Sequence, residues 1–174
     1  LNIGKTHVGE FGSLKALVQT KLEIFNDSEK DAFQVALYDD QRILDCAIST
    51  GKKTVTFGRS EKADLFIADI KEGVNGAAMT VTLGHKEERA DINFKVAHET
   101  WPINAAGAAA LALAAGVSLE KSCFALSSFT GVGGRYKIIE TKKNTVIDDA
   151  YNANPDSMLS GLSSLIRGFK ERQK

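Results

Sequence analysis

The chain has 174 residues, which is enough for one ordinary domain or for one domain and part of another. Its 22 basic and 22 acidic residues cancel, so no overall field favours a nucleic acid or an anionic membrane, and we expect no nucleic-acid partner. The two cysteines, Cys46 and Cys123, have no CxxC spacing. This argues against a disulfide framework or a zinc site and is typical of a reducing cytosol.

The sequence gives no sign of a membrane anchor or a secretion signal. No basic segment leads into an apolar signal region. The longest apolar run, residues 105–117, is too short to cross a bilayer and follows Asn104, so we expect a buried helix and no transmembrane segment. The chain begins with Leu1 instead of methionine, which we interpret as an internal cut in a longer protein.

The first part of the chain alternates strand and helix patterns, which predicts a parallel α/β sheet. Residues 4–13 carry three glycines around one histidine and are expected to form a loop. The predicted strands cover residues 1–3, 33–37 and 54–57, and the predicted helices cover residues 13–26 and 41–49.

Two basic side chains in this part have both a functional and a structural interpretation. His7, in the glycine-rich loop, could face a ligand or a metal, although a lone histidine is more often structural. Lys21 lies within the apolar stripe of helix 13–26, where lysine either extends to solvent or becomes a neutral, nucleophilic amine. Such an amine can react with carbon dioxide to give a carbamate, an anionic oxygen ligand suited to magnesium. A lysine stem that merely covers apolar surface is the alternative.

From residue 63 the pattern changes to strands without intervening helices. Residues 64–73, 77–84 and 91–97 predict a small antiparallel sheet appended to the main one, with Lys86 to Arg89 as a charged hairpin turn.

Two helices are predicted to follow, from Pro102 to Gly116 and over residues 118–128. Asn104 lies in the first turn of the alanine-rich helix. There its carboxamide could donate to and accept from a purine edge, or could simply belong to the helix cap.

Residues 131–134, with three glycines, predict a hinge between a domain at residues 1–130 and a second at residues 131–174. This stretch is not a dinucleotide fingerprint, because the third glycine of GxGxxG is missing and no helix follows. Arg135 stands at the exit of the hinge.

The stretch TVIDDAYNANPDSM, residues 145–158, predicts a strand, a loop and a helix that starts at Pro155. Loops at the carboxyl ends of strands are where α/β folds bind ligands, and a capped turn rich in Asx residues is the alternative. The polar side chains gathered in this loop are Asp148, Asp149, Tyr151, Asn152 and Asn154.

Several of these motifs occur together in the order seen in one enzyme family. They are NIGKTHVGEFGSL with Lys21 fourteen residues after His7, TVTFG followed by Ala63 and Asp64, NAAGAAALALAAGV, GGR, and IDDAYNANPDSM. In this order the chain resembles the Mur ligases over nearly all of its length. YNANPDSM is most similar to the member that adds D-alanyl-D-alanine to UDP-MurNAc-tripeptide.

The resemblance implies an ATP-dependent ligase, which converts a carboxylate into an acyl phosphate that an amine attacks. By resemblance, His7 and Lys21, the latter as a carbamate, bind Mg²⁺. Asn104 matches an adenine-contacting asparagine, and Arg135 and Asp149 match ribose-contacting residues. The implied fold is α/β: the latter part of a central ATP-binding domain with a small antiparallel sheet, then the start of a Rossmann-like C-terminal domain. The implied location is the bacterial cytoplasm.

The chain also departs from the family pattern. Thr100 stands where members usually carry a histidine, four residues before the asparagine, and Tyr38 stands where they carry an asparagine. No GxxxxGK[ST] phosphate loop occurs in these 174 residues, so we interpret the chain as an internal fragment and expect it to be inactive alone. A sister ligase with another amino acid or a folate substrate, and a non-catalytic scaffold of the same fold, are the alternatives.

Overall fold

The computed structural model describes residue 3, residues 8–73 and residues 78–169. In this part of the chain, five strands form one sheet in the order β1-β2-β3-β4-β5, and two more strands form a separate sheet. The strands are Gln34–Leu37 (β1), Thr54–Gly58 (β2), Leu65–Glu72 (β3), Met79–His85 (β4), Glu88–Phe94 (β5), Lys137–Glu140 (β6) and Thr145–Asp148 (β7). The helices are Val8–Phe11 (α1), Leu14–Asn26 (α2), Gln41–Ser49 (α3), Trp101–Ala114 (α4), Leu119–Ser127 (α5) and Pro155–Gly168 (α6).

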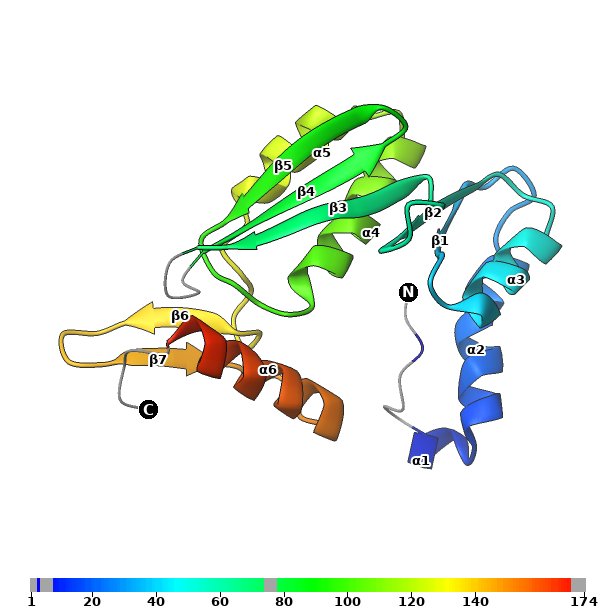
Figure 1. Ribbon diagram of the computed structural model, residues 1–174. Coiled ribbons are helices and arrows are strands. Elements are labelled where there is room, and N and C mark those ends of the chain that lie inside the picture. Colours follow the sequence, from blue (N-terminus) through cyan, green and yellow to red (C-terminus); the bar gives the residue numbers. More distant parts are fainter. Residues whose placement is uncertain (1–2, 4–7, 74–77, 170–174) are drawn as a thin grey trace.

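The mixed α/β fold expected from the sequence is confirmed. Figure 1 shows α1, α2 and α3 at one end of the molecule and β6, β7 and α6 at the other, with the antiparallel strands above. Within the described ranges, no helix combines the length and the apolar character that a membrane crossing requires. The division at residue 130 stays a prediction.

The N-terminal elements largely follow the predicted pattern. Ser13 caps α2, because its hydroxyl accepts a hydrogen bond from the Ala16 N–H at 3.1 Å. One expectation was wrong: within the predicted loop 4–13, the VGEF segment forms the single turn α1. The expected strand at residues 1–3 has only Ile3 inside the described residues, and Ile3 is not in a strand.

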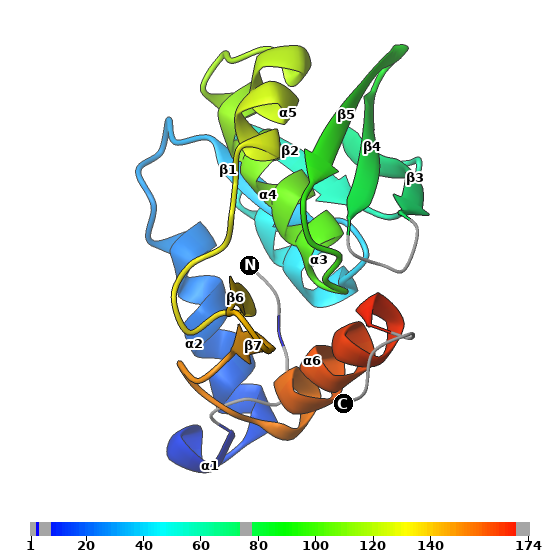
Figure 2. The ribbon, with the colours of Figure 1, turned by 90° about the vertical axis from the view of Figure 1, so that its left-hand side faces the viewer.

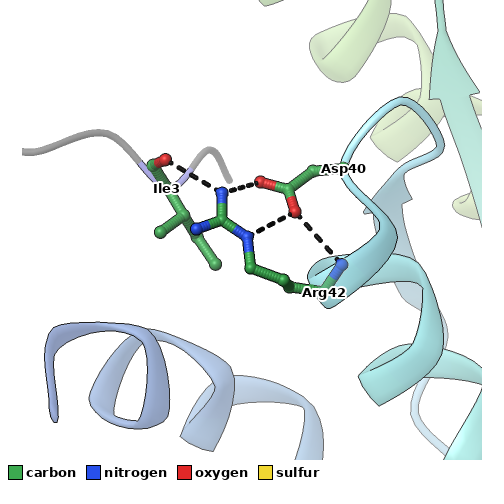
Figure 3. A network of polar contacts seen from close by, with 3 residues as sticks. All are labelled: Ile3, Asp40 and Arg42. Atoms are coloured by element: carbon green, nitrogen blue, oxygen red, sulfur yellow. Dashed lines mark hydrogen bonds and ion pairs between the residues drawn. The ribbon is translucent and has the colours of Figure 1, made fainter. Parts of the chain in front are cut away.

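Ile3 is instead tied to the start of α3 by a charged side chain. Figure 3 shows Arg42 between the Ile3 carbonyl, at 3.3 Å from Nη2, and the Asp40 carboxylate, at 2.6 Å. Asp40 also caps α3 by accepting from the Arg42 N–H at 3.1 Å. The Arg42 guanidinium holds the pKa of the Asp40 carboxyl below its usual value, against a smaller opposing effect of burial.

The antiparallel strands extend the parallel ones in a single sheet. The strand β1 pairs parallel with β2, and β2 pairs parallel with β3 through two residue pairs, Phe57 with Leu65 and Gly58 with Phe66. Beyond this junction β3, β4 and β5 pair antiparallel. The turn between β4 and β5 is tighter than the predicted residues 86–89, because Glu88 already pairs with His85.

The alanine-rich helix α4 joins the two halves of the sheet, because it contacts β1, β2 and β3. After Trp101 and Pro102 its buried residues are all alanines, which allow close approach. Gly107 lies so near Phe57 that an added Cβ would be 3.1 Å from the ring. Figure 2 shows α4 and α5 on the same side of β3, β4 and β5. The main core forms between these helices and the sheet, around Leu65, Val81 and Ile92.

The C-terminal segment begins with the hairpin of β6 and β7, which pair antiparallel. The helix α6 starts at Pro155, as predicted. Asn154 accepts from the Ser157 N–H at 3.0 Å, and the Asn154 N–H donates to the Ser157 hydroxyl at 3.1 Å, which makes a capping box.

The close packing of Gly84 in β4 against Phe66 can be tested by substitution. Gly84 pairs with Phe66 on one side and Arg89 on the other, and the Arg89 guanidinium lies 4.8 Å from the Phe66 ring centre. A Cβ on Gly84 would come within 2.7 Å of the Phe66 ring. We therefore expect Gly84→Ala to lower the free energy of unfolding by about 1–3 kcal/mol, measured by urea denaturation. The loss should shrink in a Phe66→Leu background, and an equal loss in both backgrounds would contradict this cause.

Candidate functional site

A cavity of about 380 Å³ lies where the C-terminal segment meets α4 and α5. This volume is in the range of sites for small molecules and cofactors, which are typically apolar with a few polar groups. Most of the surface area of its wall is apolar. The apolar residues are Phe94, Trp101, Ala105, Ala108, Leu126, Phe129 and Val132. The polar groups are His98, Thr100, Asn104, Arg135, Tyr136, Asp149, Ser157 and Ser160.

Three of the predicted site residues lie together in this cavity although they are far apart in the sequence. Asn104 comes from the first turn of α4, Arg135 from the glycine-rich linker, and Asp149 from the residue after β7. The cavity therefore combines a carboxamide, a guanidinium and a carboxylate on a largely apolar background. Such a set can hydrogen-bond a flat, polar-edged ligand.

Two adjacent carboxylates fix the linker that carries Arg135. The Gly134 N–H donates to Asp148 Oδ2 at 2.9 Å, and the Tyr136 N–H donates to Asp149 Oδ1 at 3.1 Å. Gly134 has φ +73°, which favours glycine, and a Cβ there would come within 3.1 Å of the Tyr151 side chain. Arg135 is thus held between two anchored backbone positions.

Only part of the polar loop faces the cavity. Asp148 anchors the linker and also accepts from the Ala150 N–H at 3.4 Å, and Asn154 caps α6. Asn152 accepts from the Ala153 N–H at 2.8 Å. Tyr151 is 68% exposed, and the Arg135 guanidinium carbon lies 4.0 Å from its ring centre. Asn152 and Asn154 therefore have the backbone hydrogen bonds expected of a capped turn rich in Asx residues, whereas Asp149 lines the cavity.

The aromatic part of the wall was not predicted from the sequence. Trp101 contacts Phe94 and Phe129 edge-on, with ring centres 5.1 and 5.3 Å apart. His98 contacts Tyr136 edge-on at 4.5 Å, which connects the main core to the C-terminal segment. The available signal was the cluster of a histidine and a tryptophan just before Asn104.

The surroundings of His98 favour its neutral form. The Thr100 N–H donates to His98 Nδ1 at 3.2 Å, which places the ring proton of the neutral form on Nε2. Burial lowers the pKa of His98 below its ordinary value of 6.5, while Asp149 and Glu99 oppose this shift.

The helix α6 borders the cavity with Ser157 and Ser160, and further along it makes polar contacts to Glu99 and Glu72. The Glu99 N–H donates to the buried Ser164 hydroxyl at 3.2 Å. Arg167 lies 3.8 Å from Glu99 and 3.9 Å from Glu72, and because all three side chains are substantially exposed, each ion pair contributes little stability. We therefore expect the Ser164 hydrogen bond to hold α6 against Glu99 more firmly than the two ion pairs do.

Comparison with known proteins identifies the family of this chain. The sequence pattern of the Mur ligase middle domain matches residues 1–112. The chain belongs to the Mur ligase family.

Curated and solved relatives agree with this assignment. The chain is 34% identical over 167 residues to the UDP-N-acetylmuramoyl-tripeptide–D-alanyl-D-alanine ligase of Mycobacterium bovis, covering 95% of this chain and 32% of that protein. The Bacillus subtilis ligase of the same name is 29% identical, with 98% and 36% covered. The structure of MurF from Acinetobacter baumannii matches with a TM-score of 0.83 and 30% identity, over 95% of this chain and 36% of that one. The chain thus spans about a third of the length of these relatives.

The Mur ligase resemblance also predicts a magnesium site, which the described residues do not form by themselves. His7 lies outside the described residues. Lys21 is partly buried on α2. Figure 1 shows α2 at the opposite end of the molecule from α6, and α6 contributes Ser157 and Ser160 to the cavity wall. Among the described residues, no cluster of three His, Cys, Asp or Glu side chains could hold a metal ion. The metal-binding roles of His7 and Lys21 stay predictions.

The lowered pKa of His98 predicts that the stability of the chain depends on pH. The unfolded chain takes up a proton at His98 near pH 6.5, whereas the folded chain does so only at lower pH, since burial lowers the pKa. The contribution of neutral His98 to the free energy of unfolding is therefore fully present above pH 6.5. It is lost as the pH falls toward the pKa of His98 in the folded chain. We expect the melting temperature of the wild-type chain to fall more between pH 7.5 and 5.5 than that of His98→Phe. Parallel curves for the two proteins would refute this role.

Proposed function

We propose that the chain is the nucleotide-binding part of an ATP-dependent carbon–nitrogen ligase of peptidoglycan precursor synthesis. In this proposal the whole ligase joins D-alanyl-D-alanine to UDP-MurNAc-tripeptide in the bacterial cytoplasm, through an acyl phosphate. The observation that carries it is the cavity in which Asn104, Arg135 and Asp149 meet. The relative from Mycobacterium bovis, which is named for this reaction, supports the choice of substrates.

The chemistry of the cavity suits the adenosine end of ATP. The Asn104 carboxamide can donate to and accept from a purine edge, and Trp101 and Phe129 offer an apolar, aromatic wall. Arg135 and Asp149 can hydrogen-bond ribose hydroxyls, because one side chain donates and the other accepts. A solved MurF from Thermotoga maritima, 24% identical with a TM-score of 0.82, is described as a complex with ADP.

Sister ligases are the second candidate. A UDP-N-acetylmuramate–L-alanine ligase of Acetivibrio thermocellus is 27% identical over 169 residues, below the 34% of the D-alanyl-D-alanine ligase. The higher identity favours the D-alanyl-D-alanine reaction.

We propose that Mg²⁺ is bound by His7 and by Lys21 as a carbamate, in the intact ligase only. When bound, Mg²⁺ would neutralise phosphate charge. The protein's part would be to present the Lys21 carbamate oxygen from α2, whose Ser13 cap fixes the start of the helix.

The Asn104 proposal is tested by nucleotide binding to the 174-residue chain. Because a bound adenine would lose its hydrogen bonds to the carboxamide, we expect Asn104→Ala to weaken ADP binding about tenfold in ligand-observed NMR titrations. Asn144→Ala, at an exposed position between β6 and β7, is the matched control and should leave binding unchanged. Equal affinities for all three proteins would rule out an adenine contact.

ATP-dependent ligation by this chain alone would contradict the proposal that it is inactive without a phosphate loop.

The Lys21 proposal is tested in a longer ligase that contains this chain and a phosphate loop. We expect Lys21→Ala to lose ligase activity and to recover part of it in bicarbonate, which can supply the missing oxygen ligand. Lys15→Ala, an exposed lysine on the same helix, is the control and should keep its activity. Full activity of Lys21→Ala without bicarbonate would exclude the carbamate.

A further inference from the structure

Two buried hydroxyl groups have no hydrogen-bond partner within the described residues. They are the Tyr136 phenol and the Ser160 hydroxyl, and both residues line the cavity that contains Asn104 and Asp149. Buried polar groups in folded proteins are paired in the large majority of cases, because an unmade hydrogen bond is unfavourable. Two such groups at one cavity therefore point to a ligand with polar edges.

The structure holds Tyr136 in place from several sides. Its backbone has φ +53°, a conformation that non-glycine residues rarely adopt, and its N–H is bound to Asp149. Its ring lies edge-on to His98 and is almost completely buried. Strained backbone of this kind concentrates at sites that bind ligands.

Ser160 and Ser157 both lie on α6, but their hydroxyls differ in hydrogen bonding. Ser157, one turn earlier, lines the same cavity, but its hydroxyl already takes part in the capping box with Asn154. The Ser160 hydroxyl has no comparable role. The helix lies close to the polar loop here, since a Cβ on Gly161 would be 3.0 Å from Asp149 Oδ2.

We propose that the Tyr136 and Ser160 hydroxyls are additional contacts to the base or ribose of the bound nucleotide, an inference that rests on the proposed function. Both act as neutral hydrogen-bonding groups that the ligand satisfies.

The chemistry of the cavity favours the nucleoside over the phosphates. Neither hydroxyl carries a charge, and the nearby Asp149 carboxylate would repel a phosphate. Burial and Asp149 raise the pKa of Tyr136 to about 12, so the phenol keeps its proton and can donate. A base nitrogen or a ribose oxygen can accept this hydrogen bond.

If the two hydroxyls had only a structural role, their removal would have a different effect from the one expected for ligand contacts. If each hydroxyl were paired inside the folded chain, its removal would destabilise the protein and leave ligand affinity unchanged. If each waits for a ligand, its removal relieves an unfavourable buried group, so the free chain becomes more stable while binding becomes weaker.

The test measures ADP affinity and melting temperature for Tyr136→Phe and Ser160→Ala in the 174-residue chain. Ser163→Ala is the matched control, because Ser163 is exposed on the same helix and reports the effect of alanine on helix propensity. We expect each variant to bind ADP about threefold to tenfold more weakly than wild type. We also expect Tyr136→Phe to melt above wild type, and Ser160→Ala to melt above Ser163→Ala.

The outcomes separate this inference from the proposed function. If Asn104→Ala weakens ADP binding but Tyr136→Phe or Ser160→Ala does not, the assignment of that hydroxyl is overturned and the proposed function stands. A melting temperature below that of its reference also overturns it, because the hydroxyl would then have a partner in the free chain. If the wild-type chain does not bind ADP, both the inference and the proposed nucleotide site fail.

Discussion

The cavity depends on the way two neighbouring carboxylates hold a glycine-rich linker. Asp148 binds the Gly134 N–H and Asp149 binds the Tyr136 N–H, so the backbone on both sides of Arg135 is fixed to the end of β7. Hydrogen bonds to a charged acceptor are stronger than those between neutral groups. A linker of this composition would otherwise sample many conformations, and the positions of Arg135 and Tyr136 would not be defined.

The same loop serves two purposes through different residues. Asp148, Asn152 and Asn154 satisfy backbone N–H groups, and the Asn154 cap gives α6 a defined start. Asp149 uses one oxygen for the linker and also borders the cavity. Structural and functional interpretations of an Asx-rich loop are therefore compatible, because they apply to different side chains.

Much of the fold follows from local sequence patterns, and the wall of the cavity does not. Pro155 after Asn154 predicted the start of α6, and the alanine-rich segment predicted α4, because capping and composition act within a few residues. The resemblance to Mur ligases selected Asn104, Arg135 and Asp149, which lie in one cavity. Tyr136 and Ser160 were not predicted, since their burial depends on a positive φ and on how α6 packs against the core. His7 itself lies outside the described residues, so its role stays a prediction.

The narrow junction between β2 and β3 has a consequence for the order of folding. The strands β3, β4 and β5 are neighbours in sequence and pair antiparallel, so their contacts form with little loss of loop entropy. The parallel half meets them through only two residue pairs between β2 and β3, which is a short strand contact. Since α4 follows both halves in the chain and packs against β1, β2 and β3, we expect its docking to couple the two halves into one cooperative unit. The helix that carries Asn104 is therefore also the element that unites the sheet.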